Sequence, residues 1–289
     1  MAITDTSPIT IERLVAETRT VYSLPFFYER LNEAINHPRS SIDDIARIIT
    51  EDQGLTARIL KLANSPMFGY YSRVDSITRA VTIIGTQQLR DLALASSVIK
   101  VFHGIPEELI SMASFWQHSI ACGIIARNLA TYLRESNVER FFVAGILHDV
   151  GQLIMCTTVP DTVRALSEKS RESGQLYFCA EQELLGFDHA DVGSALFREW
   201  KIPASIVEPV ACHHAPALAT QFPLQTAVIH LADIICQGMQ FGQSAEWFVP
   251  PLAEATWDRL GMPISMLGTI LKQSEPQIHE TFTILTEGS

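Results

Sequence analysis

Hydrophobic positions along this chain repeat at the three- and four-residue spacing of amphipathic helices from Ile11 onward, and most Gly and Pro residues fall between the repeating segments. Alternating patterns of the length that a β-strand needs are absent. Ser41 followed by Asp44 resembles a capping box, which would open a helix with Ile45 and Ile49 on its apolar face. The pattern therefore predicts an all-α protein, built as a multi-helix bundle.

Glycine and proline predict where several of these helices end. A helix over 55–63 must stop at Asn64-Ser65-Pro66, because Pro66 disfavours the α conformation of the residue before it. We expect the Asn and Ser side chains of this stop to bond local backbone groups and not a ligand. The next predicted helices span 76–85 and 86–101 and are separated at Gly85.

The run His-Gly-Ile-Pro at 103–106 is the best candidate for a boundary, because it interrupts an apolar helix just before the histidine-rich half of the chain. A long helix over 107–133 is expected to follow, and two closing helices are expected near 252–260 and 264–271. The predicted parts are an N-terminal helical part (1–105), a histidine-rich helical part (106–240) and a C-terminal helical extension (241–289).

One short run, residues 144–152, places two strong metal ligands side by side. An apolar helix delivers His148 and Asp149, and we expect it to stop at Gly151. Alone the dipeptide proves little, but further His and Asp residues lie in other predicted helices. These companions are His118, His189, His213, His214 and Asp233.

Imidazole and carboxylate ligands together suit divalent Fe, Mn, Zn or Mg, with Fe or Mn favoured, and the lack of a thiolate in the group argues against a structural zinc cage. Ligands spread over five or more helices are typical of a site built inside a bundle. Asp149 could bridge two ions, which would activate a water molecule and clamp a phosphoryl oxygen as in phosphoester hydrolysis. We therefore assign Asp149 as the candidate catalytic residue.

Composition narrows the function classes. The chain has 289 residues and a net charge of -11, so it repels phosphate backbones and a general nucleic-acid-binding surface is disfavoured. Its five cysteines form no CxxC pair and resemble the reduced, buried cysteines of a cytosolic protein. We find no basic N-terminal targeting region and no membrane-length apolar run, so we expect a cytoplasmic protein that does not bind membranes.

An ordered series of motifs makes the sequence resemble the HDOD family, a branch of the HD phosphohydrolase superfamily found in bacterial signalling. The resemblance covers about residues 15–240. In the first half the motifs are Leu24-Pro25, residues 45–49 with Asp52 and Leu55, residues 62–66, and residues 80–85 leading to Leu89-Arg90. In the second half they are residues 116–119, 144–152, 189–193 and 200–203, His213-His214 and Ala232-Asp233.

The resemblance implies an HD-like helical subdomain over the second half, with two metal sites that share Asp149. The first site would comprise His118, His148, Asp149 and Asp233. The second would comprise Asp149, His189, His213 and His214. Two departures from the family pattern disfavour phosphodiesterase activity, on cyclic-di-GMP in particular. Gln152 stands where the phosphodiesterase branch commonly has a lysine that helps to hold phosphate. Ala215-Pro216 replaces the residues that mark cyclic-di-GMP phosphodiesterases.

Other interpretations of individual histidines remain open at this point. His230 and His279 are interpreted as core residues whose polar atoms are bonded. His189 is either a ligand or part of a helix start that Asp188 caps. Adjacent side chains on a helix diverge by about 100°, so one residue of the pair His213-His214 could face away from the site.

These observations favour a bacterial regulatory protein whose His/Asp site holds one or two metal ions and acts mainly as a binding module. The alternative is a metal-dependent phosphohydrolase or phosphodiesterase that acts on a nucleotide or another phosphoester. A third reading is a helical adaptor with an empty core. We expect input to arrive by binding of a signalling protein or a small phosphorylated ligand, because residues 1–14 and 241–289 are too short for a sensor domain. The oligomeric state is left open.

Overall fold

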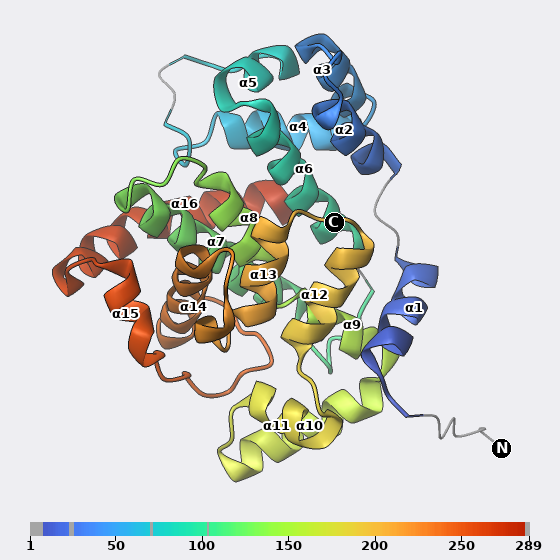
Figure 1. Ribbon diagram of the computed structural model, residues 1–289, viewed down its shortest axis with the longest axis vertical. Helices are drawn as coiled ribbons and strands as arrows, with labels where there is room; N and C mark the ends of the chain where they lie inside the picture. Colours follow the sequence, from blue (N-terminus) through green and yellow to red (C-terminus); the bar gives the residue numbers. More distant parts are fainter. Residues whose placement is uncertain (1–7, 23–25, 70–71, 103, 287–289) are drawn as a thin grey trace.

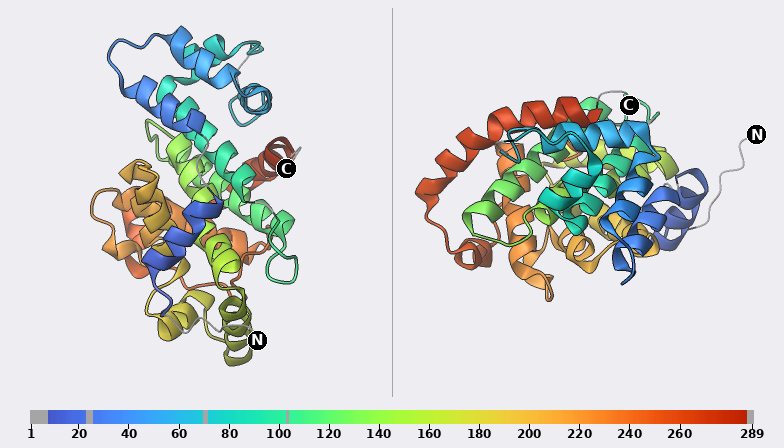
Figure 2. Two further views of the ribbon diagram at one scale, coloured as in Figure 1. Left: turned by 90° about the vertical axis from the view of Figure 1, so that its right-hand side faces the viewer. Right: turned by 90° about the horizontal axis from the view of Figure 1, so that it is seen from above.

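A computed structural model describes residues 8–22, 26–69, 72–102 and 104–286, and every regular element in these ranges is helical. The all-α prediction is therefore confirmed. The molecule is elongated, with α2–α5 at one end and α10 and α11 at the other (Figures 1 and 2). Leu24-Pro25 of the motif series lies outside the described residues, as does His103 of the proposed boundary.

The first part of the chain forms α1 (Ile11–Val21), α2 (Phe26–Asn36), α3 (Ile42–Thr50), α4 (Gln53–Ala63), α5 (Ile77–Ile84) and α6 (Thr86–Val101). The middle part forms α7 (Met112–Tyr132), α8 (Glu139–Leu147), α9 (Val150–Thr158), α10 (Pro160–Ser173), α11 (Tyr177–Leu185), α12 (His189–Glu199), α13 (Ala204–Cys212), η1 (Pro216–Leu218) and α14 (Pro223–Gly238). The last part forms α15 (Glu254–Leu260), η2 (Ile264–Met266) and α16 (Leu267–Thr286).

Local signals explain several helix ends in the first part. The Ser41 hydroxyl accepts from the Asp44 N–H while the Asp44 carboxylate accepts from the Ser41 N–H, which is the predicted capping box. Helix α4 stops at Asn64 as expected. The Asn64 amide donates to the carbonyls of Leu60 and Val74 and accepts from the Val74 N–H, so this side chain ties the helix end to the next segment. The same expectation was wrong for Ser65, whose hydroxyl is buried without a hydrogen-bond partner among the described residues.

Two hydrophobic clusters hold the molecule together. A smaller one joins α2–α6 and includes Leu31, Ile59 and Leu89. A larger one surrounds α7, which packs against α8, α14 and α16. Helix α1 is first in the chain but packs against α9 and α12 of the second half. No finding tests the division at residue 105, which stays a prediction.

The stretch Glu139–Thr158 is long and apolar enough to be a candidate membrane span by composition. It comprises two helices, α8 and α9, and 89% of its apolar window is buried inside the molecule. Such burial is typical of core helices, which pass the same test of length and composition.

Four expectations about the chain were wrong. The long helix begins at Met112 and not at residue 107. The closing helix extends to Thr286 and contains Pro276, because its apolar face is buried along its whole length. His279 on this helix is exposed and is not a core residue. Gly151 does not end a helix: it is the second residue of α9, which begins directly after the His-Asp pair.

Candidate metal centre

All seven sequence-predicted site residues meet in the core of the second half. The middle of α7 carries His118, and the middle of α14 carries Asp233. The remaining five stand at helix ends: His148 closes α8, Asp149 precedes α9, His189 begins α12, and His213 and His214 follow α13. Six of these side chains are buried, with at most 2% of their surface exposed, and only His214 is half-buried.

Two pairs of glycines permit the close helix packing that brings these ends together. Gly123 of α7 lies against Gly145 of α8, where an added Cβ on Gly145 would be 2.6 Å from the Gly123 Cα. Gly151 of α9 lies against the backbone of His189, where an added Cβ would collide with the His189 carbonyl and lie 2.9 Å from the Gly193 nitrogen. Both crossings place ligand-bearing backbone within a few ångströms of the next helix.

The Asp149 carboxylate stands between two groups of imidazoles. Its Oδ2 atom lies 3.3 Å from His148 Nε2 and 3.8 Å from His118 Nε2. Its Oδ1 atom lies 3.1 Å from His189 Nε2 and 3.6 Å from His213 Nε2. One carboxylate therefore has an oxygen directed to each group, which is the arrangement that a bridging ligand requires.

Asp233 completes the first group. Its Oδ1 atom lies 3.1 Å from His118 Nε2 and 3.6 Å from His148 Nε2. The same oxygen accepts a hydrogen bond from the Gln237 amide at 2.9 Å. His118, His148 and Asp233 place one ligand atom each within 4.8 Å of one another, which is compact enough for a single ion.

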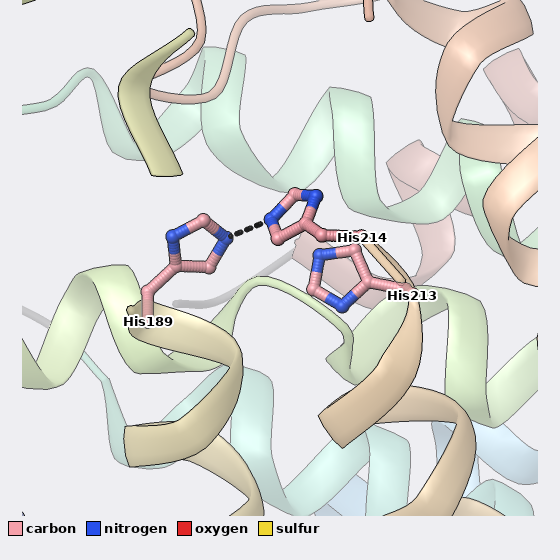
Figure 3. Close-up of side chains that lie close together, drawn as sticks. All are labelled: His189, His213 and His214. Atoms are coloured by element: carbon pink, nitrogen blue, oxygen red, sulfur yellow. Dashed lines mark hydrogen bonds between the residues drawn. The ribbon is translucent and has the colours of Figure 1, made fainter. Parts of the chain in front are cut away.

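His214 completes the second group (Figure 3). Its Nε2 atom lies 2.9 Å from His189 Nε2, and its ring stacks on Phe178 at a centroid distance of 4.1 Å. The imidazoles of His189, His213 and His214 also fit around one ion. Neither His213 nor His214 faces away from the site, which the sequence had left open, because α13 ends at Cys212 and the second histidine has left the helix.

Hydrogen bonds at the outer ring nitrogens orient three of the histidines. His148 Nδ1 lies 2.7 Å from the Gly145 carbonyl, and His213 Nδ1 lies 2.7 Å from the Val210 carbonyl. A carbonyl only accepts, so each Nδ1 must donate, and a neutral ring then directs the lone pair of Nε2 into the centre. His189 Nδ1 contacts Glu181 Oε2 at 2.6 Å, which is the carboxylate partner often found behind a metal-bound imidazole.

The residues present fit a metal ion. The Nε2 atoms of His118, His148 and His213 are buried and have no hydrogen-bond partner among the residues that the structure describes, although a buried ring nitrogen normally has one. All three face the carboxylate oxygens of Asp149 or Asp233. Lone pairs and carboxylates that converge on the same place are the donor set of a divalent cation.

The electrostatics of the centre favour positive charge. Burial opposes ionisation of Asp149 and Asp233, but the facing imidazoles hold the pKa of both carboxyls well below the usual range. Burial likewise opposes a charged His148, yet Asp149 raises the pKa of this imidazole well above its usual value. The two carboxylates thus attract either a proton on the rings or a metal ion.

Sequence reasoning missed Glu181, which is fully buried on α11 and also accepts from the backbone N–H of His189. A glutamate eight residues before a candidate histidine carries no spacing signal, so only its burial reveals it. The role of Gln152 was also missed: its Nε2 lies 3.5 Å from His189 Nε2, and its Oε1 accepts from the Ala245 N–H. His230 is buried as expected, between the His213 carbonyl and the Ala253 N–H.

The fold and the centre together define a class: helical proteins with a buried His/Asp cluster in which one aspartate stands between two groups of histidines. A family model described as the HDOD domain matches residues 21–216. The chain therefore belongs to the HDOD family, as its motifs predicted.

Known structures share this fold over nearly the whole chain. A candidate phosphohydrolase from Shewanella amazonensis is 26% identical with a TM-score of 0.74, over 94% of this chain and 98% of its own. An HDOD domain protein of unknown function from Geobacter sulfurreducens is 24% identical with a TM-score of 0.72, over 95% of this chain and 97% of its own.

A sequence relative is an uncharacterized protein of Treponema pallidum, which is 25% identical over 66% of this chain. The matched part of this chain covers only 37% of that relative's length.

Proposed function

We propose that this protein is a regulatory module of bacterial signal transduction whose His/Asp centre holds two divalent metal ions and that acts mainly by binding. The observation that carries the proposal is the position of Asp149, with Oδ2 facing His118 and His148 and Oδ1 facing His189 and His213. Fe or Mn suits this mixture of imidazole and carboxylate best, and Zn or Mg is the alternative. The proposed partners are a signalling protein and a small phosphorylated ligand whose phosphate would be held by the metal ions, since the described lining of the cavity beside His118 has no Lys or Arg.

The test is the metal content of protein purified without chelator. We expect about two ions per chain in the wild type. Asp149→Ala should lose both ions, because Asp149 faces both groups, whereas His118→Ala and His189→Ala should each lose one. His279→Ala is the matched control, since this exposed histidine lies far along α16 and should leave the content unchanged. A wild-type protein without stoichiometric metal would indicate the helical adaptor with an empty core.

A second candidate function is metal-dependent phosphoester hydrolysis. The position of Asp149 between both groups favours it, as does the likeness to the Shewanella protein. A pair of ions at such a centre supplies an activated water and a clamp for a phosphoryl oxygen. In that case Asp149 is the catalytic residue, as it holds the two groups in one centre.

The cavity beside His118 argues for binding over turnover. Its described lining contains amide, hydroxyl, carboxyl and apolar side chains and no Lys or Arg to neutralise a phosphate. Protein loaded anaerobically with Fe or Mn is assayed on nucleotides, cyclic dinucleotides and a generic phosphodiester. Turnover that Asp149→Ala abolishes and His279→Ala retains would establish the enzyme, and absence of turnover in the metal-loaded wild type would leave the binding module.

A further inference from the structure

Residues 240–249, here called the strap, cross one side of the metal centre without regular secondary structure. The strap begins where α14 ends, and the positive φ angles of Gln240 (57°) and Gly242 (68°) turn the chain away from the helix. Within ten residues it contacts α7, α9 and α11, three helices that each carry or support a residue of the centre.

The first attachment is backbone packing on α7. A Cβ on Gly242 would collide with the Ser114 carbonyl and lie 2.5 Å from the His118 nitrogen, so only glycine permits this approach. The next N–H, that of Gln243, donates to the same Ser114 carbonyl at 3.3 Å. The strap therefore lies directly on the turn of α7 that carries His118.

The second attachment is Gln152, whose side chain is buried with 4% of its surface exposed. Its Oε1 accepts from the Ala245 N–H at 3.0 Å, and its Nε2 faces His189. The third attachment is Glu246, whose two carboxylate oxygens accept from the Tyr177 N–H at 2.8 and 2.9 Å. Tyr177 begins α11, the helix that carries Glu181.

A cavity of about 540 Å³ lies between the strap, α7 and the end of α14. His118 and Gln237 form its inner wall, and the strap residues Glu246 and Trp247 line the opposite side. Gln237 donates to Asp233, while its own Oε1 is buried and has no hydrogen-bond partner within the described part of the chain. The Nδ1 atom of His118 is likewise buried without a partner. Two residues of the inner wall thus each contain a buried polar atom without a hydrogen-bond partner among the described residues, beside the first group of ligands.

We propose that this cavity is the pocket through which a ligand reaches the metal centre, and that Gln152 is the positioning residue that fixes the strap as its outer wall. The pocket takes a ligand with one metal-coordinating group and an otherwise uncharged remainder that combines hydrogen-bonding and apolar parts. Its described lining holds amides, hydroxyls and apolar side chains, one carboxyl group (Glu246) and no Lys or Arg. The ligand class rests on the proposed metal centre. The attachment of the strap does not, since its hydrogen bonds involve no metal ligand side chain.

Two substitutions of Gln152 test whether its hydrogen bond to Ala245, and not only its volume, holds the strap in place. Gln152→Leu keeps the side-chain volume but removes the acceptor for Ala245, whereas Gln152→Glu keeps an acceptor and removes the amide donor. Hydrogen exchange of residues 241–249 is measured in metal-free protein, with Gln243→Ala as control because only the backbone of this exposed residue bonds the strap. Glu246→Leu releases the third attachment without touching Gln152.

In Gln152→Leu we expect the amides of Phe241, Gln243 and Ala245 to exchange about three- to tenfold faster together, as the loss of one hydrogen bond implies. Gln152→Glu and the control should match the wild type. Two results would refute the proposal that Gln152 fixes the strap. One is faster exchange at Ala245 alone. The other is unchanged exchange in both Gln152→Leu and Glu246→Leu.

The pocket is tested on Mn-loaded protein by the rate at which EDTA removes the metal. Gln152→Leu should lose metal several-fold faster at an unchanged starting content, because an opened wall speeds exit. A lower starting content with a normally protected strap would show that Gln152 only orients His189, and would refute the pocket. A wild type that binds none of Mn, Fe, Zn and Mg would refute the proposed metal function, while the exchange experiment would still decide whether Gln152 fixes the strap.

Discussion

The crossing of α9 and α12 at Gly151 provides the sharpest test of how this site is assembled. An alanine there would place its Cβ 2.7 Å from the His189 carbonyl carbon and 2.9 Å from the Gly193 nitrogen, both backbone atoms that cannot rotate away. The collision with the His189 carbonyl oxygen is closer still, and ordinary contacts start near 3.4 Å, so the two helices must separate by roughly 1.5 Å. Because His189 begins α12, this separation also moves its imidazole away from Asp149.

We expect Gly151→Ala to lower the free energy of unfolding by about 3 kcal/mol, the upper end for an overpacked core, and the melting temperature by about 6 °C. The variant should also lose the ion of the second group and keep that of the first. Urea unfolding and metal analysis measure the two effects. The matched control is Gly238→Ala, where an added Cβ meets nothing within 4 Å and the change should stay below about 1 kcal/mol.

Equal stabilities of Gly151→Ala and Gly238→Ala would refute this account of the helix crossing. Loss of stability with unchanged content of both ions would refute the link between the crossing and the position of His189.

Two further predictions concern the buried carboxyl group of Glu181 and the half-buried one of Glu246. Glu181→Gln removes the charge behind His189 and should weaken binding at the second group by about 10- to 100-fold in a Mn titration, whereas Glu183→Gln on the exposed face of α11 should not. Burial raises the pKa of Glu246 from 4.5 to about 7, so the folded protein retains this proton where the unfolded chain releases it. The unfolding free energy of the metal-free wild type should therefore fall relative to Glu246→Gln as the pH rises from about 4.5 to 7, by up to about 3 kcal/mol. A pH-independent difference would contradict the raised pKa.

The fold was predictable because local signals and tertiary packing agree. The capping box at Ser41, the stop at Asn64 and the separation at Gly85 each act within four residues of sequence, and the structure has all three. The length of the closing helix was underestimated because here local signals and tertiary packing disagree. Pro276 is a helix breaker on local grounds, but burial of Ile278 and Leu285 along α16 maintains the helix.

The clustering of the candidate ligands was predictable only from the order of the motifs, because the site joins segments up to 115 residues apart, from His118 to Asp233. The supporting residues had no comparable signal. Glu181 contacts His189 across the turn between α11 and α12. Gln152 accepts a hydrogen bond from Ala245, which lies in a segment without helical periodicity. Such contacts depend on the packed structure, and a sequence pattern cannot supply them.

Helix ends explain why this centre can use adjacent residues as ligands. Inside a helix, His148 and Asp149 or His213 and His214 would point about 100° apart. Here α8 ends and α9 begins between the first pair, and α13 ends before the second, so the backbone turns where the side chains must converge. His189 gains the same freedom at the start of α12, where Asp188 caps the helix and leaves the imidazole to face Asp149. The sequence offered capping and a place in the site as alternatives for this segment, and the structure divides them between neighbours: Asp188 caps α12, and His189 faces Asp149.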